Sequence, residues 1–217
     1  MTMALDGEAM RAMVVEIAAA MAESRDELCR LDGVIGDADH GIAMATGFGA
    51  ARDAVVAMEP LSEPTAVMNM AAKAFLNAVG ASSGPLYATA LMRAGAVVKG
   101  KAVLEEADVV AMLQAMAVGI RDRGKAEPGE KTMLDAWAPA ALAAGEAQAA
   151  GKGLGACLDA AVAAAREGAE ATKGLLAGKG RAERLGERAL GHMDPGAASA
   201  VVLIEAVRRS LAGDRAA

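Results

Sequence analysis

Apolar residues recur at helical spacing along almost the whole chain. In the first stretch Met10, Met13, Val14, Ile17 and Met21 fall on one face, which predicts a helix from about residue 6 to 30. Glycine, proline or clustered charge interrupts the later stretches, and Pro60 and Pro64 mark one such connection. The further helices are predicted at about residues 40–58, 64–79, 86–98, 104–122, 130–149, 153–177 and 196–211.

These eight helices follow one another with no linker between independent halves, so we expect a single all-α domain over residues 1–217. The composition agrees, because 54% of the residues are hydrophobic but only 2% are aromatic, and β-branched residues are a minority. Alanine and unbranched side chains lose little conformational freedom in a helix. Sheets favour the β-branched and aromatic residues that are scarce here.

Charge and cysteine content limit the function classes. The net charge of −6 argues against a nucleic-acid partner, because phosphate backbones favour a basic surface. We expect Cys29 and Cys157 to be two buried thiols in a reducing cytosol. No signal peptide is evident, and no apolar stretch approaches the roughly 20 residues of a membrane span. The expectation is a cytoplasmic protein that does not enter a membrane.

The segment "LDGVIGDADHG", residues 31–41, concentrates Asp32, Asp37 and Asp39 in what we expect to be a loop. Two carboxylates about 4 Å apart repel by roughly 4 kcal/mol at an effective dielectric constant near 20. A divalent cation would relieve this repulsion, and oxygen ligands suit Mg²⁺. The spacing does not match an EF-hand. The alternative is that the aspartates are helix caps and turn formers, and His40 is either a phosphate neighbour or a capping residue.

Three other glycine-containing segments are candidates for anion binding. "GASSGPLYAT" (residues 80–89) resembles an anion cradle without being a Walker A loop, and close helix crossing is its alternative explanation. "RGKAEPGEKTM" (123–133) and "GRAERLGERALGHMDPGAAS" (180–199) mix glycine with basic residues that either offset phosphate charge or are simply solvated. The basic candidates are Lys131, Arg181, Arg184 and Arg188. Asp194 is expected to cap the last helix.

Taken together, "IGDADHG", "GASSGPL", "RGKAEPGEKTMLDAW" and "GRAERLGERALGHMDPGA" resemble, in order and spacing, the nucleotide-binding L subunits of dihydroxyacetone kinases. The resemblance covers nearly the whole chain. It implies an antiparallel eight-helix barrel whose end holds ADP or ATP through Mg²⁺, with two metal ions expected.

The resemblance also implies roles for particular residues. Asp32, Asp37 and Asp39 would be the Mg²⁺ ligands and, with Arg181, would act on the transferring phosphoryl group. The implied nucleotide contacts are His40, Gly41, Ile42, Ala43, Ser82, Ser83, Gly124, Met133, Arg181, Asp194, Pro195 and Gly196. No residue of this chain needs to be a covalent nucleophile, so catalysis is expected to come from positioning and charge neutralisation.

The resemblance further implies partners. In the phosphotransferase-linked branch, a phosphohistidine on an M-type subunit rephosphorylates bound ADP, and the phosphoryl group then passes to dihydroxyacetone held by a K-type subunit. In the ATP-dependent branch the nucleotide exchanges. The alternatives are a nucleotide sensor that docks on a transcription regulator without turnover, and a helical scaffold without ligand. Homodimer formation stays open.

Five positions depart from the family's usual pattern. Ala43 stands where asparagine is common. In the last segment Glu183, Arg184, Met193 and Ala198 replace serine, tyrosine, glutamine and threonine. These changes leave the three aspartates intact but leave the acceptor open, so kinase activity on a tetrulose is an alternative to activity on dihydroxyacetone.

Overall fold

The computed structural model describes residues 4–59, 63–80 and 82–212, so the Pro60 turn predicted above lies outside the described residues. The described chain is built almost entirely of helices, with one pair of two-residue strands. The α-helices are α1 (Gly7–Glu23), α2 (Arg25–Ile35), α3 (His40–Val56), α4 (Pro64–Ala78), α5 (Ser83–Val97), α6 (Glu106–Gly124), α7 (Leu134–Ala149), α8 (Leu154–Ala171) and α9 (Pro195–Leu211). Two 3₁₀ helices, η1 (Thr172–Gly174) and η2 (Arg181–Ala189), lie between α8 and α9.

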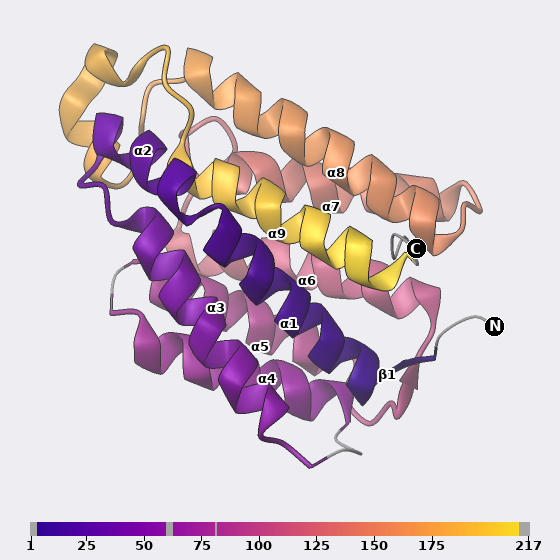
Figure 1. Ribbon diagram of the computed structural model, residues 1–217. Coiled ribbons are helices and arrows are strands. Elements are labelled where there is room, and N and C mark those ends of the chain that lie inside the picture. Colours follow the sequence, from indigo (N-terminus) through magenta and orange to yellow (C-terminus); the bar gives the residue numbers. More distant parts are fainter. Residues whose placement is uncertain (1–3, 60–62, 81, 213–217) are drawn as a thin grey trace.

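Eight of the α-helices form a closed antiparallel ring (Figure 1). From α3 to α9 each helix packs against the next, α1 packs against α3, and α9 closes the ring against α1. The chain direction reverses from each helix of the ring to the next, through connections that include α2 between α1 and α3 and a long segment between α8 and α9. The predicted all-α eight-helix barrel is confirmed.

The interior of the ring contains one continuous apolar core. Three of its rings pack edge to face: Phe48 lies 4.8 Å from Phe75 and 5.7 Å from Tyr87, measured between ring centroids. Gly47 makes room for this cluster, because a Cβ there would lie 2.4 Å from the Phe75 ring. Alanine is the most frequent of the remaining core residues, which lets the helices approach closely.

The first predicted helix is in fact two. The chain bends at Ser24, and α2 continues to Ile35 instead of ending near residue 30. The bend follows from the sequence, because the dense apolar stripe of α1 stops at Met21, while α2 buries only Leu28, Asp32 and Ile35. Asp32 therefore lies on a helix and not in a loop. The interpretation of residues 31–39 as one loop was wrong.

Other helix boundaries also differ from the predictions. Helix α6 begins at Glu106, because Leu104 belongs to the strand β2 (Val103–Leu104), which pairs antiparallel with β1 (Leu5–Asp6). Helix α7 begins at Leu134, not near residue 130. Helix α8 ends at Ala171 instead of near residue 177, and the remaining residues enter the α8–α9 connection, which we define as residues 172–194.

The alternating direction of the ring has one consequence for function. Helices α3, α5, α7 and α9 all begin at the end of the barrel where α2 and the α8–α9 connection lie next to each other (Figure 1). Each helix begins with unpaired backbone N–H groups and carries partial positive charge there. We call this the N-terminal end of the barrel.

Two glycines of α8 offer a test of how tightly the ring is packed. A Cβ at Gly168 would lie 2.0 Å from the carbonyl oxygen of Asp135 in α7, whereas a Cβ at Gly155 would meet only Ala212 at 4.0 Å. We expect Gly168→Ala to lower the free energy of unfolding by about 1 to 3 kcal/mol, because α7 and α8 must separate. Gly155→Ala should leave it unchanged or raise it by up to about 1 kcal/mol. Urea denaturation measures both, and equal effects would contradict the close packing of α7 on α8.

Candidate functional site

A cavity of about 740 Å³ lies at the N-terminal end of the barrel, a size suited to a nucleotide. Its walls come from the beginnings of α3, α5, α7 and α9, the ends of α2 and α6, and the α8–α9 connection. The residues with charged or hydroxyl side chains that line it are Asp32, Asp37, Asp39, Ser82, Ser83, Arg123, Lys131, Thr132, Lys179, Arg181 and Asp194.

The beginnings of α3 and α5 leave backbone amides available to a ligand, whereas those of α7 are paired: Leu134 N donates to the Thr132 hydroxyl at 3.2 Å and Asp135 N to the Thr132 carbonyl oxygen at 3.0 Å. The N-cap residues Asp39, Ser82 and Met133 make no side-chain cap hydrogen bond to α3, α5 and α7. Within the described parts of the chain, the amides of Gly41 and Ile42 in the first turn of α3 have no protein acceptor. Helix α9 differs, because the Asp194 carboxylate accepts a hydrogen bond from Ala197 N at 2.7 Å. The cavity therefore has amide donors suited to an anion.

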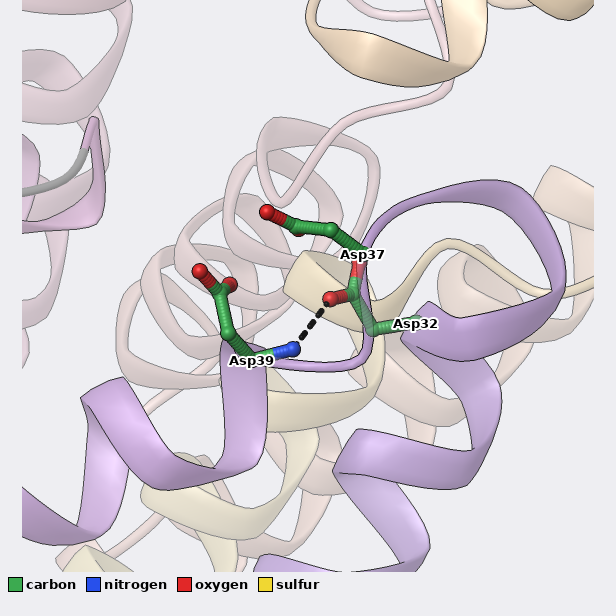
Figure 2. A group of neighbouring side chains, drawn as sticks. All are labelled: Asp32, Asp37 and Asp39. Carbon is green, nitrogen blue, oxygen red and sulfur yellow. Dashed lines mark hydrogen bonds between the residues drawn. The ribbon is translucent and has the colours of Figure 1, made fainter.

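In the same cavity, three carboxyl groups gather where α2 turns into α3 (Figure 2). One oxygen from each of Asp32, Asp37 and Asp39 lies within 4.8 Å of the others. Asp32 is placed by the backbone, since its carboxylate accepts hydrogen bonds from Asp39 N at 2.9 Å and His40 N at 3.2 Å. Gly36 is required beside it, because a Cβ there would lie 2.1 Å from an Asp32 carboxylate oxygen.

The electrostatics of this cluster favour a cation. Desolvation raises the pKa of Asp39, and the neighbouring charges of Asp37 and Asp32 raise it further. The Arg181 guanidinium, on η2, pairs with Asp37 at 2.6 Å and offsets part of this charge. Three hard oxygen donors so close together fit Mg²⁺, so these residues are suitable ligands for the ion that the sequence implied.

His40 links the beginnings of α3 and α9. Its Nε2 lies 2.9 Å from the Ser199 hydroxyl, which donates to the Gly196 carbonyl oxygen at 2.9 Å. Burial lowers the pKa of the His40 imidazole, and the charge of Asp32 opposes this. Tyr87 extends the contact into the core, with its hydroxyl 3.5 Å from that of Ser199. The imidazole therefore holds two helix beginnings together at the cavity.

The loop before α7 is organised by Asp135. This carboxylate accepts hydrogen bonds from Gly129 N at 2.5 Å and Thr132 N at 2.8 Å. Lys131, between them, adopts a left-handed backbone with φ of 58° and turns its side chain into the protein, where it is only 1% exposed. Burial lowers the pKa of Lys131, while the charges of Asp194 and Asp135 oppose the shift.

The structure brings most of the residues implied by the sequence to this cavity. All three aspartates line it, as do the candidate nucleotide contacts His40, Ala43, Ser82, Ser83, Gly124, Met133, Arg181, Asp194, Pro195 and Gly196. Gly41 and Ile42 are not among the residues that line the cavity. Gly41 packs on α2, where a Cβ would lie 2.0 Å from the Arg25 carbonyl oxygen, and the Ile42 side chain is 56% exposed. Any contribution from these two residues comes from their amides.

Other candidates lie away from the cavity. Arg184 and Arg188 are exposed on η2 and do not line it. Of the five departures from the family pattern, only Ala43 lines the cavity. Glu183 and Arg184 are exposed, and Met193 and Ala198 pack against the main core. The serines of "GASSGP" line the cavity while Gly84 packs tightly, since its Cβ would lie 2.0 Å from the Val79 carbonyl oxygen. The close packing of that segment is therefore observed, and anion binding by its serines stays a prediction.

Several residues that line the cavity were not predicted from the sequence. Ile35, Leu86 and Ile120 supply apolar wall, and Arg123 and Lys179 add positive charge. The three apolar residues fit the core stripes of their helices, so periodicity gives no sign that they face a cavity. Arg123 lies next to Gly124 in a segment already singled out. Its position in the last turn of α6 was the available signal.

Asp194 provides a test of the site's electrostatics. Burial raises the pKa of this carboxyl group to about 7, although the Ala197 amide and the Lys131 charge lower it. Because the folded pKa exceeds the unfolded value, stability from the protonated form is full below about pH 4 and is lost as the pH rises to about 7. Asparagine cannot ionise. We therefore expect the free energy of unfolding of Asp194→Asn to fall by about 1 to 3 kcal/mol less than that of the wild type as the pH rises. Urea denaturation of the metal-free protein from pH 4.5 to 8 measures it, and parallel profiles for the two proteins would contradict the shift.

None of the helices formed by the described residues combines the length and the apolar character needed to cross a membrane.

Comparison with known proteins gives consistent matches. The chain is 38% identical over 185 residues to the ADP-binding subunit DhaL of PEP-dependent dihydroxyacetone kinase 1 from Listeria innocua, covering 85% of this chain and 87% of the relative. It is 35% identical over 178 residues to the corresponding Escherichia coli subunit, covering 82% and 84%. L-erythrulose 1-kinase from Mycolicibacterium smegmatis is 37% identical over 88% of this chain, which spans 33% of that enzyme.

Solved structures agree. The crystal structure of dihydroxyacetone kinase from C. freundii in complex with AMP-PNP and Mg²⁺ superimposes with a TM-score of 0.72 at 25% identity, over 97% of this chain and about a third (35%) of that one. Residues 34–209 match the DAK2 domain. This match runs from the end of α2 into the last turn of α9, and it contains Asp37, Asp39 and Arg181 but not Asp32. The chain therefore belongs to the DAK2 domain family.

Proposed function

We propose that the chain is the ADP/ATP–Mg²⁺-binding subunit of a dihydroxyacetone kinase. The observation that carries this proposal is that one cavity is lined both by the beginnings of four helices and by three clustered carboxyl groups. The first attracts phosphate, and the second repels it unless a divalent cation lies between them. A metal–nucleotide complex satisfies both features.

The proposed roles follow from this arrangement. Asp32, Asp37 and Asp39 would hold Mg²⁺, proposed as two ions, which supply charge neutralisation for the phosphoryl group when bound. The first-turn amides of α3 and α5 and the Ser82 and Ser83 hydroxyls donate to phosphate oxygens. Leu86, Ile120 and Met133 offer apolar surface for the base.

Arg181 has a separate role in this proposal. Its guanidinium lies close to the aspartate cluster and carries a permanent positive charge. On the proposed reading it stabilises charge on the phosphoryl group as that group moves between donor and acceptor. Because Arg181 lies on the α8–α9 connection, its contribution depends on where that connection is held.

The proposed reaction uses separate partner subunits. The L. innocua and E. coli relatives, whose lengths this chain nearly matches, are named as ADP-binding subunits of PEP-dependent enzymes. We infer that a phosphohistidine on an M-type subunit rephosphorylates ADP in place, and that the phosphoryl group then passes to a ketose held on a K-type subunit in the cytoplasm. This chain contributes binding and positioning and no covalent nucleophile.

A second candidate is supported by one comparison. The chain is 37% identical to L-erythrulose 1-kinase from M. smegmatis and 33% identical to L-erythrulose kinase from Pectobacterium atrosepticum. The nucleotide cavity described above serves a tetrulose kinase equally well, because the ketose site lies on another polypeptide or domain. The acceptor is decided by the K-type partner.

The metal assignment predicts the behaviour of Asp37→Asn. Loss of one carboxylate ligand should weaken Mg²⁺-dependent ADP binding by on the order of tenfold to a hundredfold and slow phosphoryl transfer in parallel. Asp53→Asn is the matched control, since Asp53 is an exposed carboxylate paired with Arg52 on α3. Calorimetry measures binding. Reconstitution with K-type and M-type subunits measures ketose phosphate, with dihydroxyacetone and erythrulose compared as acceptors.

Full transfer and tight ADP binding in Asp37→Asn would refute the metal assignment. A protein that binds ADP but forms no ketose phosphate with either acceptor would instead favour a nucleotide sensor. A protein that binds no nucleotide at all would leave only a scaffold role.

A further inference from the structure

The α8–α9 connection contains 23 residues and carries two parts of the candidate site, Arg181 on η2 and Asp194 at its end. Few of its residues are buried in an apolar cluster. Within it, the buried apolar residues Ala182 and Ala189 form a small cluster with Ile35 of α2, separate from the main core. The backbone of η2 is also irregular, with Gly186 at φ 56° and ψ −130°. Its position therefore needs support from polar contacts.

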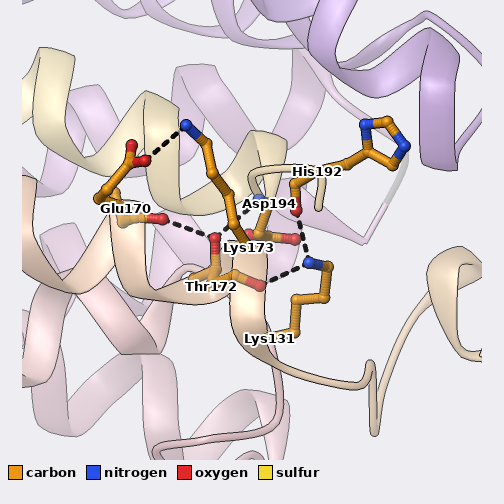
Figure 3. Close-up of polar contacts among 7 residues, drawn as sticks. Lys131, Glu170, Thr172, Lys173, His192 and Asp194 are labelled. Atoms are coloured by element: carbon orange, nitrogen blue, oxygen red, sulfur yellow. Dashed lines mark hydrogen bonds and ion pairs between the residues drawn. The ribbon is translucent and has the colours of Figure 1, made fainter. Parts of the chain in front are cut away.

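The two ends of this connection meet at the side chain of Lys131 (Figure 3). The ammonium group donates to the carbonyl oxygen of Thr172, where the connection leaves α8, at 2.5 Å. It also donates to the carbonyl oxygen of His192, where the connection returns to α9, at 2.5 Å. One side chain thus joins residues that are 20 positions apart.

Neighbouring hydrogen bonds reinforce the same junction. Asp194 N donates to the Thr172 hydroxyl at 2.9 Å, and that hydroxyl donates to the Ala169 carbonyl oxygen at 2.6 Å. Gly191 N donates to the Lys173 carbonyl oxygen at 2.8 Å. We call Lys131, Thr172 and the His192–Asp194 backbone the connection clamp.

The geometry of Lys131 is unusual for a lysine that only supports folding. Lysine is rarely buried fully unless it is paired with an opposite charge. Among the described residues no carboxylate lies within ion-pair distance of the ammonium group, although Asp194 and Asp135 act on it from farther away, and neutral carbonyl oxygens are its hydrogen-bond partners. Its left-handed backbone is also sparsely populated for residues other than glycine. In this arrangement the ammonium group donates charge-assisted hydrogen bonds to both ends of the connection.

We propose that Lys131 is a positioning residue that closes the α8–α9 connection at its base and thereby sets Arg181 and Asp194 in the nucleotide cavity. The part of this inference that concerns nucleotide affinity rests on the proposed function. The part that concerns the connection does not. Lys131 acts through the position of other residues, because its contacts are to backbone carbonyl groups.

The test compares Lys131→Met with Lys173→Met. Methionine preserves the apolar stem of Lys131 and removes the ammonium group. Lys173 is the matched control, because it is a nearby lysine on η1 whose ammonium pairs with Glu170 at the surface (Figure 3). Hydrogen–deuterium exchange of the ligand-free proteins measures the connection directly. Calorimetry measures ADP binding in Mg²⁺ and, separately, the binding of Mn²⁺ alone.

For Lys131→Met we expect exchange of amides in residues 176–192 to rise at least about tenfold, while amides of α1 and α4 keep their wild-type protection. The affinity for ADP in Mg²⁺ should fall at least about tenfold, since Arg181 and Asp194 lose their fixed position. Mn²⁺ alone should bind at least as tightly as in the wild type, because its proposed ligands lie on α2 and in the α2–α3 connection, and release of Arg181 removes a competing positive charge from Asp37. Lys173→Met should match the wild type in all three measurements.

Unchanged exchange in residues 176–192 of a folded Lys131→Met protein would overturn the clamp, whether or not the chain binds nucleotide. Faster exchange with undiminished ADP affinity would overturn its link to the site. If the wild type binds no ADP, the proposed function fails while the exchange measurement still decides the clamp.

Should Lys131→Met not fold, Thr172→Val replaces it. Valine keeps the shape but removes the acceptor for Asp194 N, so exchange near Asp194 should rise, and wild-type exchange there would refute the clamp.

Discussion

The structure depends on the direction of its helices around a closed ring. Because the chain direction reverses from each helix of the ring to the next and α9 packs back on α1, four helices begin at the same end. Their unpaired amides and partial positive charges make that end attractive to an anion before any particular side chain is considered. The apolar interior, with Phe48, Phe75 and Tyr87 at 0 to 1% exposure, fixes the helices in this arrangement. The site is therefore a property of the ring, and the connections refine it.

The connections add charged side chains of both signs to the cavity, and hydrogen bonds with the backbone set their positions. Asp32 is held by the amides of Asp39 and His40, and its carboxylate thereby stands beside two others. Arg181 approaches this cluster from the α8–α9 connection, far away in sequence, and pairs with Asp37. Lys131 fastens the base of that connection from a third segment. Three separate connections thus meet at one cavity, which explains why the site is assembled only when the whole ring is closed.

Periodicity and composition predicted an all-α domain, whereas the closed ring and most of the lining residues followed from the resemblance to dihydroxyacetone kinase L subunits. Helical periodicity is strong in a chain rich in alanine and leucine, and the glycine-containing segments recur at the connections. It did not predict that Asp32 lies on a helix, because the polar residues and Gly33 hide the weak apolar stripe of α2 that contains Leu28 and Ile35. Nor does periodicity separate Leu86 and Ile120, which face the cavity, from core residues of the same helices. Where α8 ends, the Thr172 carbonyl oxygen accepts a hydrogen bond from Lys131, 41 residues earlier, and the local pattern of apolar residues does not predict such a contact.

The most direct test of the account is a crystal structure with ADP and Mn²⁺, in which anomalous scattering locates the metal. The account predicts anomalous density between the carboxyl groups of Asp32, Asp37 and Asp39 and the diphosphate, with phosphate oxygens directed at the first turns of α3 and α5. A nucleotide bound elsewhere, or the three carboxyl groups turned toward solvent with no metal near them, would contradict it.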